Sequence, residues 1–196
     1  MNRYRRAGIL LLIVCASCAH RPAPPELRPD QPIVVLPANN RTGDPLLVSG
    51  ASLIDRYALH SDRITVGEVL AAEARFQLGE RGLRMTSHEA IAAATRGRVP
   101  RSAAAAAEIA KGKLDGLVLY LEVRHWEPDA PIHPSFVIVG MSASLVDPAS
   151  GNVIWQLDRR SAPVATPGEV TLENAYETAA RKVIAEIVSA LAPPPT

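Results

Sequence analysis

The sequence predicts a two-layer α/β sandwich, in which a mixed sheet of roughly five strands carries helices on one face. Three observations predict it. Residues 33–37 form a short apolar run, typical of a strand buried on both faces. Residues 117–126 and 136–146 then turn to apolar–polar alternation, as strands do. Residues 172–191 place apolar side chains at steps of three and four, which indicates a helix with one wide apolar stripe.

The first half of the domain alternates between strands and helices. Thr65 and Glu68 have the spacing of a capping box, in which the hydroxyl and the carboxylate each bind an exposed backbone amide. They predict a helix over 65–80. Residues 83–85 predict a brief strand, and the capping pattern at 86–89 predicts a short second helix that runs through residue 95.

The second half places three strands in succession before the last helix. An alanine-rich helix over 102–111, capped by Ser102, precedes them. A turn at 147–152 separates the last two strands, and the final one runs over 153–160. A second capping box at 166–169 predicts the start of the last helix. The predicted order is therefore β-α-β-α-α-β-β-β-α.

The amino terminus has the three parts of an export signal. Residues 1–17 contain three arginines, an apolar run too short to span a membrane, and small residues before Cys18. A cysteine in this place resembles the bacterial lipoprotein signal, in which the thiol is acylated by palmitate-type chains and becomes the mature terminus. Cys15 stands where that signal usually has leucine. A plain signal peptide or an uncleaved anchor are the alternatives.

The remaining chain divides into a tether, one domain and a tail. Residues 18–32 hold five prolines, so we expect an extended tether of about 45 Å. Residues 33–192 form a single α/β domain, and 193–196 are a tail. Ala19 is not the aspartate that retains such proteins in the inner membrane. We therefore expect lipid attachment through Cys18 to the outer membrane, facing the periplasm.

Charge and cysteine content exclude several classes of protein. The chain carries 21 basic and 20 acidic residues, a net charge of +1, which excludes the strong electrostatic signature of a nucleic-acid partner. Loss of residues 1–17 removes three arginines and leaves 18 basic against 20 acidic residues. It also leaves Cys18 as the one cysteine, so an intramolecular disulfide cannot form.

Motifs for catalysis or metal binding are not evident in the sequence. Residues 140–144 lack the second glycine of a nucleophile elbow, and 40–44 lack the glycines and lysine of a phosphate loop. A metal could use His125, Asp129 and His133, but their spacing matches no known ligand pattern. We expect no enzyme activity, no cofactor and no bound metal.

Two loops are the candidate surfaces for a protein partner. The connection 39–63 is long for a compact domain, and 126–135 combines an aromatic residue with prolines and mixed charge. Trp126 has the alternative of capping the edge of the sheet. The candidate contact residues are Asn40, Arg41, Asp44, Trp126 and His133.

Three segments together resemble a known family: IVVLPANNRTGD at 33–44, LDGLVLY at 114–120 and LVDPASGNVIW at 145–155. In this order they resemble the periplasmic lipoproteins related to the curli secretion protein CsgG and the penicillin-binding-protein activator LpoB. The closest resemblance is to an uncharacterised group that includes a neisserial surface antigen. It covers residues 33–190 and implies a domain similar to the amino-terminal domain of TolB. It transfers no catalytic residue.

The resemblance implies a non-enzymatic outer-membrane lipoprotein whose periplasmic domain binds another envelope protein, in envelope assembly or secretion of the CsgG-associated type. Residues 39–63 are too polar for the membrane hairpins of CsgG-like pores. An LpoB-like regulator of a peptidoglycan synthase is one alternative, which the short tether disfavours. A cryptic hydrolase or metal-binding protein is another. A second copy of the chain is a further candidate partner.

Overall fold

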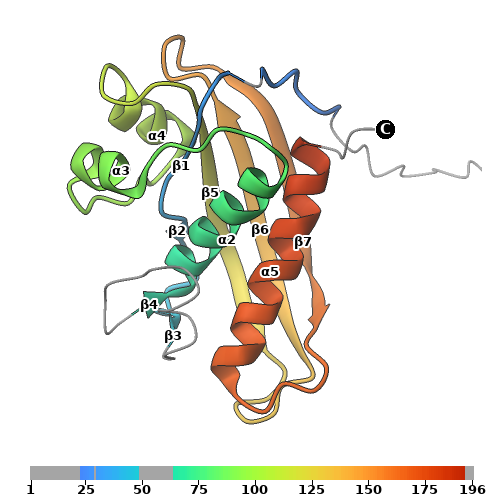
Figure 1. Ribbon diagram of the computed structural model, residues 1–196. Coiled ribbons are helices and arrows are strands. Elements are labelled where there is room, and N and C mark those ends of the chain that lie inside the picture. Colours follow the sequence, from blue (N-terminus) through green and yellow to red (C-terminus); the bar gives the residue numbers. More distant parts are fainter. Residues whose placement is uncertain (1–22, 29, 49–63, 193–196) are drawn as a thin grey trace, which may run out of the picture.

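A computed structural model describes residues 23–28, 30–48 and 64–192 (Figure 1). The predicted signal peptide with Cys18, part of the tether, residues 49–63 of the long predicted loop and the tail 193–196 lie outside the described residues. The described elements, in chain order, are β1 (Ile33–Val35), β2 (Asn39–Asn40), β3 (Leu47–Val48), β4 (Ile64–Thr65), α2 (Val66–Glu80), α3 (His88–Thr95), α4 (Ala103–Ala110), β5 (Leu117–Pro128), β6 (Phe136–Val146), β7 (Val153–Ala165) and α5 (Leu172–Leu191).

The main sheet is mixed and has five strands, as predicted. Its strand order is β1-β5-β6-β7, and β2 pairs with β5 beyond the end of β1. Both β1 and β2 run parallel to β5, whereas β5, β6 and β7 are antiparallel neighbours. β3 and β4 form a separate antiparallel pair that the sequence patterns do not predict.

The fifth strand is not the one expected. The pattern of residues 83–85 predicts a strand, but they form a single parallel bridge between Met85 and Ile33. The backbone N–H of Ile33 donates to the carbonyl of Arg84, and the backbone N–H of Thr86 donates to the carbonyl of Ile33. The chain then turns into α3. The prediction for 83–85 is therefore wrong, and β2 supplies the fifth strand.

Helices cover the sheet in two groups (Figure 1). α2 and α5 form the predicted layer and share the larger core with Ile33, Val35 and alternate residues of β5. The short helices α3 and α4 lie against the opposite face at one end of the sheet, where they cover Val34 and Tyr120. The apolar run that forms β1 is thus buried on both faces, as its composition predicted. The α/β sandwich is confirmed, with α3 and α4 as an addition on the second face.

The predicted helix caps are confirmed in part. Glu68 N donates to Thr65 Oγ1 at 3.3 Å and Thr65 N donates to Glu68 Oε2 at 2.7 Å, so the capping box of α2 is present. Ser102 caps α4 as expected. Ser87, and not Thr86, caps α3.

The last helix begins later than predicted, because its expected cap is used elsewhere. Thr166 is buried, and its Oγ1 donates to the carbonyl of Pro134 at 2.9 Å. β7 consequently continues to Ala165, beyond the predicted end at residue 160. Thr171 caps α5 instead, by accepting a hydrogen bond from Asn174 N at 3.2 Å. Within the described part of the chain, no helix has both the length and the apolar character to cross a membrane.

Candidate interaction site

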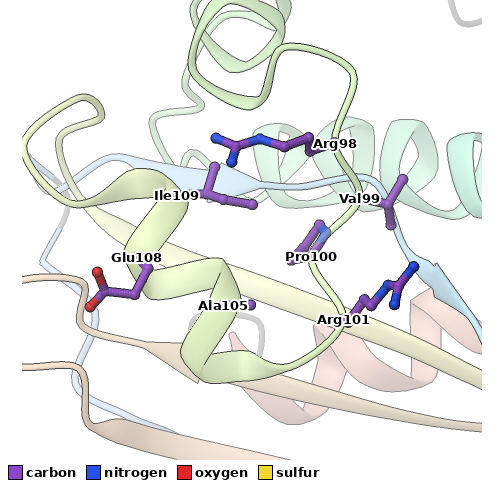
Figure 2. Close-up of a pocket in the computed structure, with 7 residues that line it drawn as sticks. All are labelled: Arg98, Val99, Pro100, Arg101, Ala105, Glu108 and Ile109. Atoms are coloured by element: carbon purple, nitrogen blue, oxygen red, sulfur yellow. The ribbon is translucent and has the colours of Figure 1, made fainter.

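A groove lies between the loop that joins α3 to α4 and the exposed side of α4 (Figure 2). The loop begins where α3 ends in left-handed conformation, at Arg96 with φ 51° and Gly97 with φ 73°. It ends where Ser102 caps α4 by accepting from Ala105 N at 3.1 Å. The groove has a volume of about 710 Å³ and is lined by Arg98, Val99, Pro100, Arg101, Ala105, Glu108 and Ile109.

The lining combines positive charge with apolar surface. Arg98 donates from Nε to the carbonyl of Thr95 at 3.2 Å. Within the described residues, the guanidinium of Arg101 makes no ion pair with a carboxylate. Val99 is 46% exposed although it is apolar. Exposed apolar surface bordered by arginine is characteristic of surfaces that bind protein.

A polar network joins the groove loop to the sheet. Asn39 Nδ2 donates to the carbonyl of Arg101 at 3.4 Å and to Tyr120 Oη at 3.0 Å. Tyr120 Oη in turn donates to Glu122 Oε2 at 2.9 Å. Burial first, and then the Glu122 carboxylate, raise the pKa of Tyr120 to about 12, while the Asn39 amide acts in the opposite direction. Tyr120 therefore stays protonated and keeps donating to Glu122 at neutral pH.

Three of the predicted contact residues, Asn40, Arg41 and Asp44, lie together at the end of β2 and in the turn that follows it. Asn40 Nδ2 donates to the carbonyl of Asp44 at 2.6 Å, and Asp44 Oδ1 accepts from Leu46 N at 3.0 Å. These two side chains hold the turn in shape. Arg41 Nη1 lies 3.5 Å from Glu122 Oε1, so it connects to the network behind the groove loop.

Trp126 and His133 lie outside this turn, on β5 and in the loop that follows it. Trp126 is only 4% exposed, and its ring packs edge-on against Tyr176, with 5.7 Å between the ring centroids and an interplanar angle of 89°. The indole therefore belongs to the core beneath α5, which does not fit the contact role predicted for it. His133 is exposed in the loop between β5 and β6, at the end of the sheet opposite α3 and α4 (Figure 1).

A hydrogen-bonded chain of three polar side chains crosses the exposed face of the sheet. His125 Nε2 lies 3.0 Å from Glu127 Oε2, and His125 Nδ1 lies 3.1 Å from Ser161 Oγ. The contact between His125 on β5 and Ser161 on β7 crosses the intervening strand β6 at Gly140, where a side chain would collide with Ser161. The order of acid, base and hydroxyl is that of a nucleophilic site. His125 and Glu127 are 38% and 67% exposed, however, so water competes for their hydrogen bonds.

The carboxylate of Asp129, which the sequence offers as a metal ligand with His125 and His133, binds backbone groups of its own loop. Asp129 Oδ1 accepts from the backbone N–H groups of Ser135 at 2.9 Å and Phe136 at 3.2 Å, so it closes the loop between β5 and β6. Within residues 23–28, 30–48 and 64–192, no three His, Cys, Asp or Glu side chains are grouped so that they could hold a metal ion.

Solved structures share the fold at low sequence identity. A single-residue variant of PelC from Paraburkholderia phytofirmans, solved as a dodecamer, aligns with a TM-score of 0.55 and 18% identity, over 87% of this chain and 94% of that chain. A second crystal form of the PelC dodecamer gives a TM-score of 0.50 and 17% identity, over 87% and 93%. No protein-family model matches the sequence, and no curated protein matches it significantly.

Two further solved structures are a neisserial lipoprotein and LpoB, the kinds of protein that the three sequence segments resemble. Lipoprotein GNA1162 from Neisseria meningitidis aligns with a TM-score of 0.49 and 16% identity, over 81% of this chain and 99% of that chain. LpoB from E. coli gives 0.43 and 16%, over 68% and 57%. These TM-scores lie below 0.5 and establish no kinship. The likeness to PelC shows that the two chains share a fold.

Sequence reasoning misses the groove, although a signal for it exists. Residues 96–101 read RGRVPR, which places three arginines within six residues between two alanine-rich helices. Such a run is usually a solvated loop. The run indicates a groove only once the tertiary structure shows that Val99 is exposed and that α4 lies beside the loop.

Proposed function

We propose that the chain is a lipid-anchored protein of the bacterial envelope whose α/β domain acts by binding another protein. The signal-like segment 1–17 and the position of Cys18 support the anchor, through an acylated thiol in the periplasmic leaflet of the outer membrane. The role that fits such a protein is in envelope assembly or secretion, with contact rather than catalysis as its mode of action.

The groove beside α4 is the observation that carries the binding role. It combines Arg98 and Arg101 with the exposed apolar side chain of Val99, and its volume is about 710 Å³. Arginine is enriched where proteins bind one another, because its planar head donates several hydrogen bonds while its stem covers apolar surface.

Self-association is a second part of the proposal. PelC, whose fold this chain shares, forms a dodecamer in its crystals. The dodecamer is a property of PelC, and it is the reason to measure the oligomeric state of this protein. Sedimentation of the purified protein would show a species of several chains if the domain assembles with itself, and a species of one chain would contradict this part.

The tether supports a partner that lies close to the membrane. Leu27 packs against the main core, so the segment between Cys18 and the domain is shorter than the proline content alone implies. The eight residues 19–26 span about 25 Å in extended form. An LpoB-like regulator of a peptidoglycan synthase needs a longer reach, and it remains the competing outcome of the experiment below.

Photo-cross-linking from the groove tests the binding role. A photoreactive amino acid replaces Val99, and in a matched control it replaces Ile154, which is equally exposed on β7 (46% and 47%). We expect one discrete cross-linked species from position 99 in intact cells, and its loss when Arg101 is changed to glutamine. Equal labelling from both positions would contradict the groove as a binding site. Recovery of a penicillin-binding protein would favour the LpoB-like role.

The anchor is tested separately by metabolic labelling. Radioactive palmitate should label the wild-type protein and not the Cys18→Ser variant, and the variant should leave the membrane fraction. Membrane association that is unchanged in Cys18→Ser would contradict the lipid anchor.

A further inference from the structure

We propose that the groove binds an extended segment of the partner in which carboxylate side chains stand beside apolar ones. This inference rests on the proposed function, and it names the chemistry that the domain recognises. Two properties of the lining carry it: the positive charge of the loop over residues 98–101, and the apolar surface between this loop and α4.

The charge of the lining favours an acidic ligand. Of the seven lining residues, Arg98 and Arg101 are cationic and Glu108 alone is acidic. Figure 2 shows Arg98 and Arg101 on the two sides of Pro100, while Glu108 projects from α4. A ligand carboxylate is therefore favoured on the loop side and repelled near Glu108. A guanidinium suits a carboxylate because it donates two parallel hydrogen bonds in the plane of the two oxygens.

Both arginines retain donors for such a ligand. Arg98 uses Nε on the carbonyl of Thr95 at 3.2 Å, which leaves its terminal nitrogens. Arg101 forms no ion pair within the part of the chain that the structure describes. Its backbone carbonyl, in contrast, is held by Asn39 Nδ2.

The apolar part of the lining favours a peptide over a small anion. Ala105, which is half-buried, and Ile109, which is 8% exposed, are one helical turn apart on the side of α4 that lines the groove. Val99, on the loop, also lines the groove and is 46% exposed. An apolar side chain placed between them would remove this surface from water, whereas inorganic phosphate would gain nothing from it.

The loop is held in one shape before any ligand binds. Arg98 N donates to the carbonyl of Thr95 at 3.0 Å at the start of the loop, and Ser102 caps α4 at its end. Pro100 is buried between them and has a fixed backbone angle. The loop itself therefore loses little conformational entropy when a ligand binds.

Peptide binding to the full mature chain in detergent tests the inference. The probe is a fluorescein-labelled peptide of alternating leucine and glutamate. Its matched controls are alternating leucine and glutamine, and alternating serine and glutamate. Fluorescence anisotropy should show the first peptide binding about tenfold more tightly than either control. Arg101→Gln should weaken that binding about tenfold, and Val99→Ser about fivefold.

The control variant is Arg160→Gln, which removes an exposed arginine from the edge strand β7. It should leave peptide binding unchanged, and all variants should unfold thermally as the wild type does. Equal affinity for the leucine–glutamate and leucine–glutamine peptides would overturn the inference, as would an unchanged affinity in Arg101→Gln. Full displacement of the peptide by equimolar inorganic phosphate would assign the site to phosphate instead.

The outcomes separate this inference from the proposed function. A discrete cross-link from position 99 together with no preference for the acidic peptide would leave the domain a binding module and remove the acidic ligand. Preference for the acidic peptide without any cross-link in cells would establish the ligand chemistry and count against the cellular role.

Discussion

The hydroxyl of Tyr120 provides a prediction that combines stability and pH. Tyr120→Phe removes one atom from a side chain that is 4% exposed. That atom accepts from Asn39 Nδ2 at 3.0 Å and donates to Glu122 Oε2 at 2.9 Å. The neutral bond contributes about 1 kcal/mol and the bond to the carboxylate about 1.5–3 kcal/mol. Asn39 and Glu122 keep a longer mutual contact of 3.4 Å, which offsets part of the loss. We expect Tyr120→Phe to lower the free energy of unfolding by about 2 kcal/mol at pH 7.

The same substitution should change the response to alkali. Because the folded-state pKa of Tyr120 is raised to about 12, the unfolded chain ionises first as the pH increases from 10. The wild type therefore loses this part of its stability between pH 10 and pH 12, and Tyr120→Phe has no such part to lose. The difference between the two proteins should be largest below pH 10 and smaller at pH 11.

Urea unfolding followed by tryptophan fluorescence at pH 7 and pH 11 measures both effects. Tyr176→Phe is the matched control, since the Tyr176 hydroxyl makes no hydrogen bond within the described residues and its loss should cost less at pH 7. A loss below about 0.5 kcal/mol in Tyr120→Phe, or a difference that is the same at both pH values, would refute the role of the network.

Further substitutions test a close backbone contact, the core and a helix cap. Gly116→Ala should lower the free energy of unfolding by about 2 kcal/mol or more, which thermal unfolding would show as a lower melting temperature. The reason is that Gly116 has φ 103° and a side chain there would collide with the carbonyl of Pro32. Gly151→Ala, at φ 76° in open space, should cost about 1 kcal/mol, and equal losses would contradict the collision. Ile184→Ala, in a fully buried position on α5, should cost about 2–5 kcal/mol in urea unfolding. Thr171→Ala should cost about 1 kcal/mol and Thr171→Ser much less, and identical losses would argue against the cap.

The regular elements of this fold could be predicted because their signals are local or periodic. The apolar stripe of α5 predicts both a helix and its buried face, and the structure buries that face against the sheet. The capping box at Thr65 is likewise complete within four residues, and both of its hydrogen bonds form in the structure. Of the candidate site, Arg41 was identified as a surface residue in a polar turn, and it connects to the network at Glu122.

Other features depend on contacts between segments far apart in the chain. Thr166 and Thr171 are equally good caps by type. The carbonyls of Pro134 and Ser135, which accept from Thr166 Oγ1 and Thr166 N, decide that Thr166 extends β7 and leaves Thr171 to begin α5. Tryptophan is a residue type that is common at protein interfaces, but α5 places Tyr176 against the ring of Trp126, and the indole is buried. The groove arises because α4 packs on the sheet and presents Ile109 to the loop at Arg98. Local sequence determines which backbone groups can pair, whereas burial depends on which surfaces the completed fold brings together.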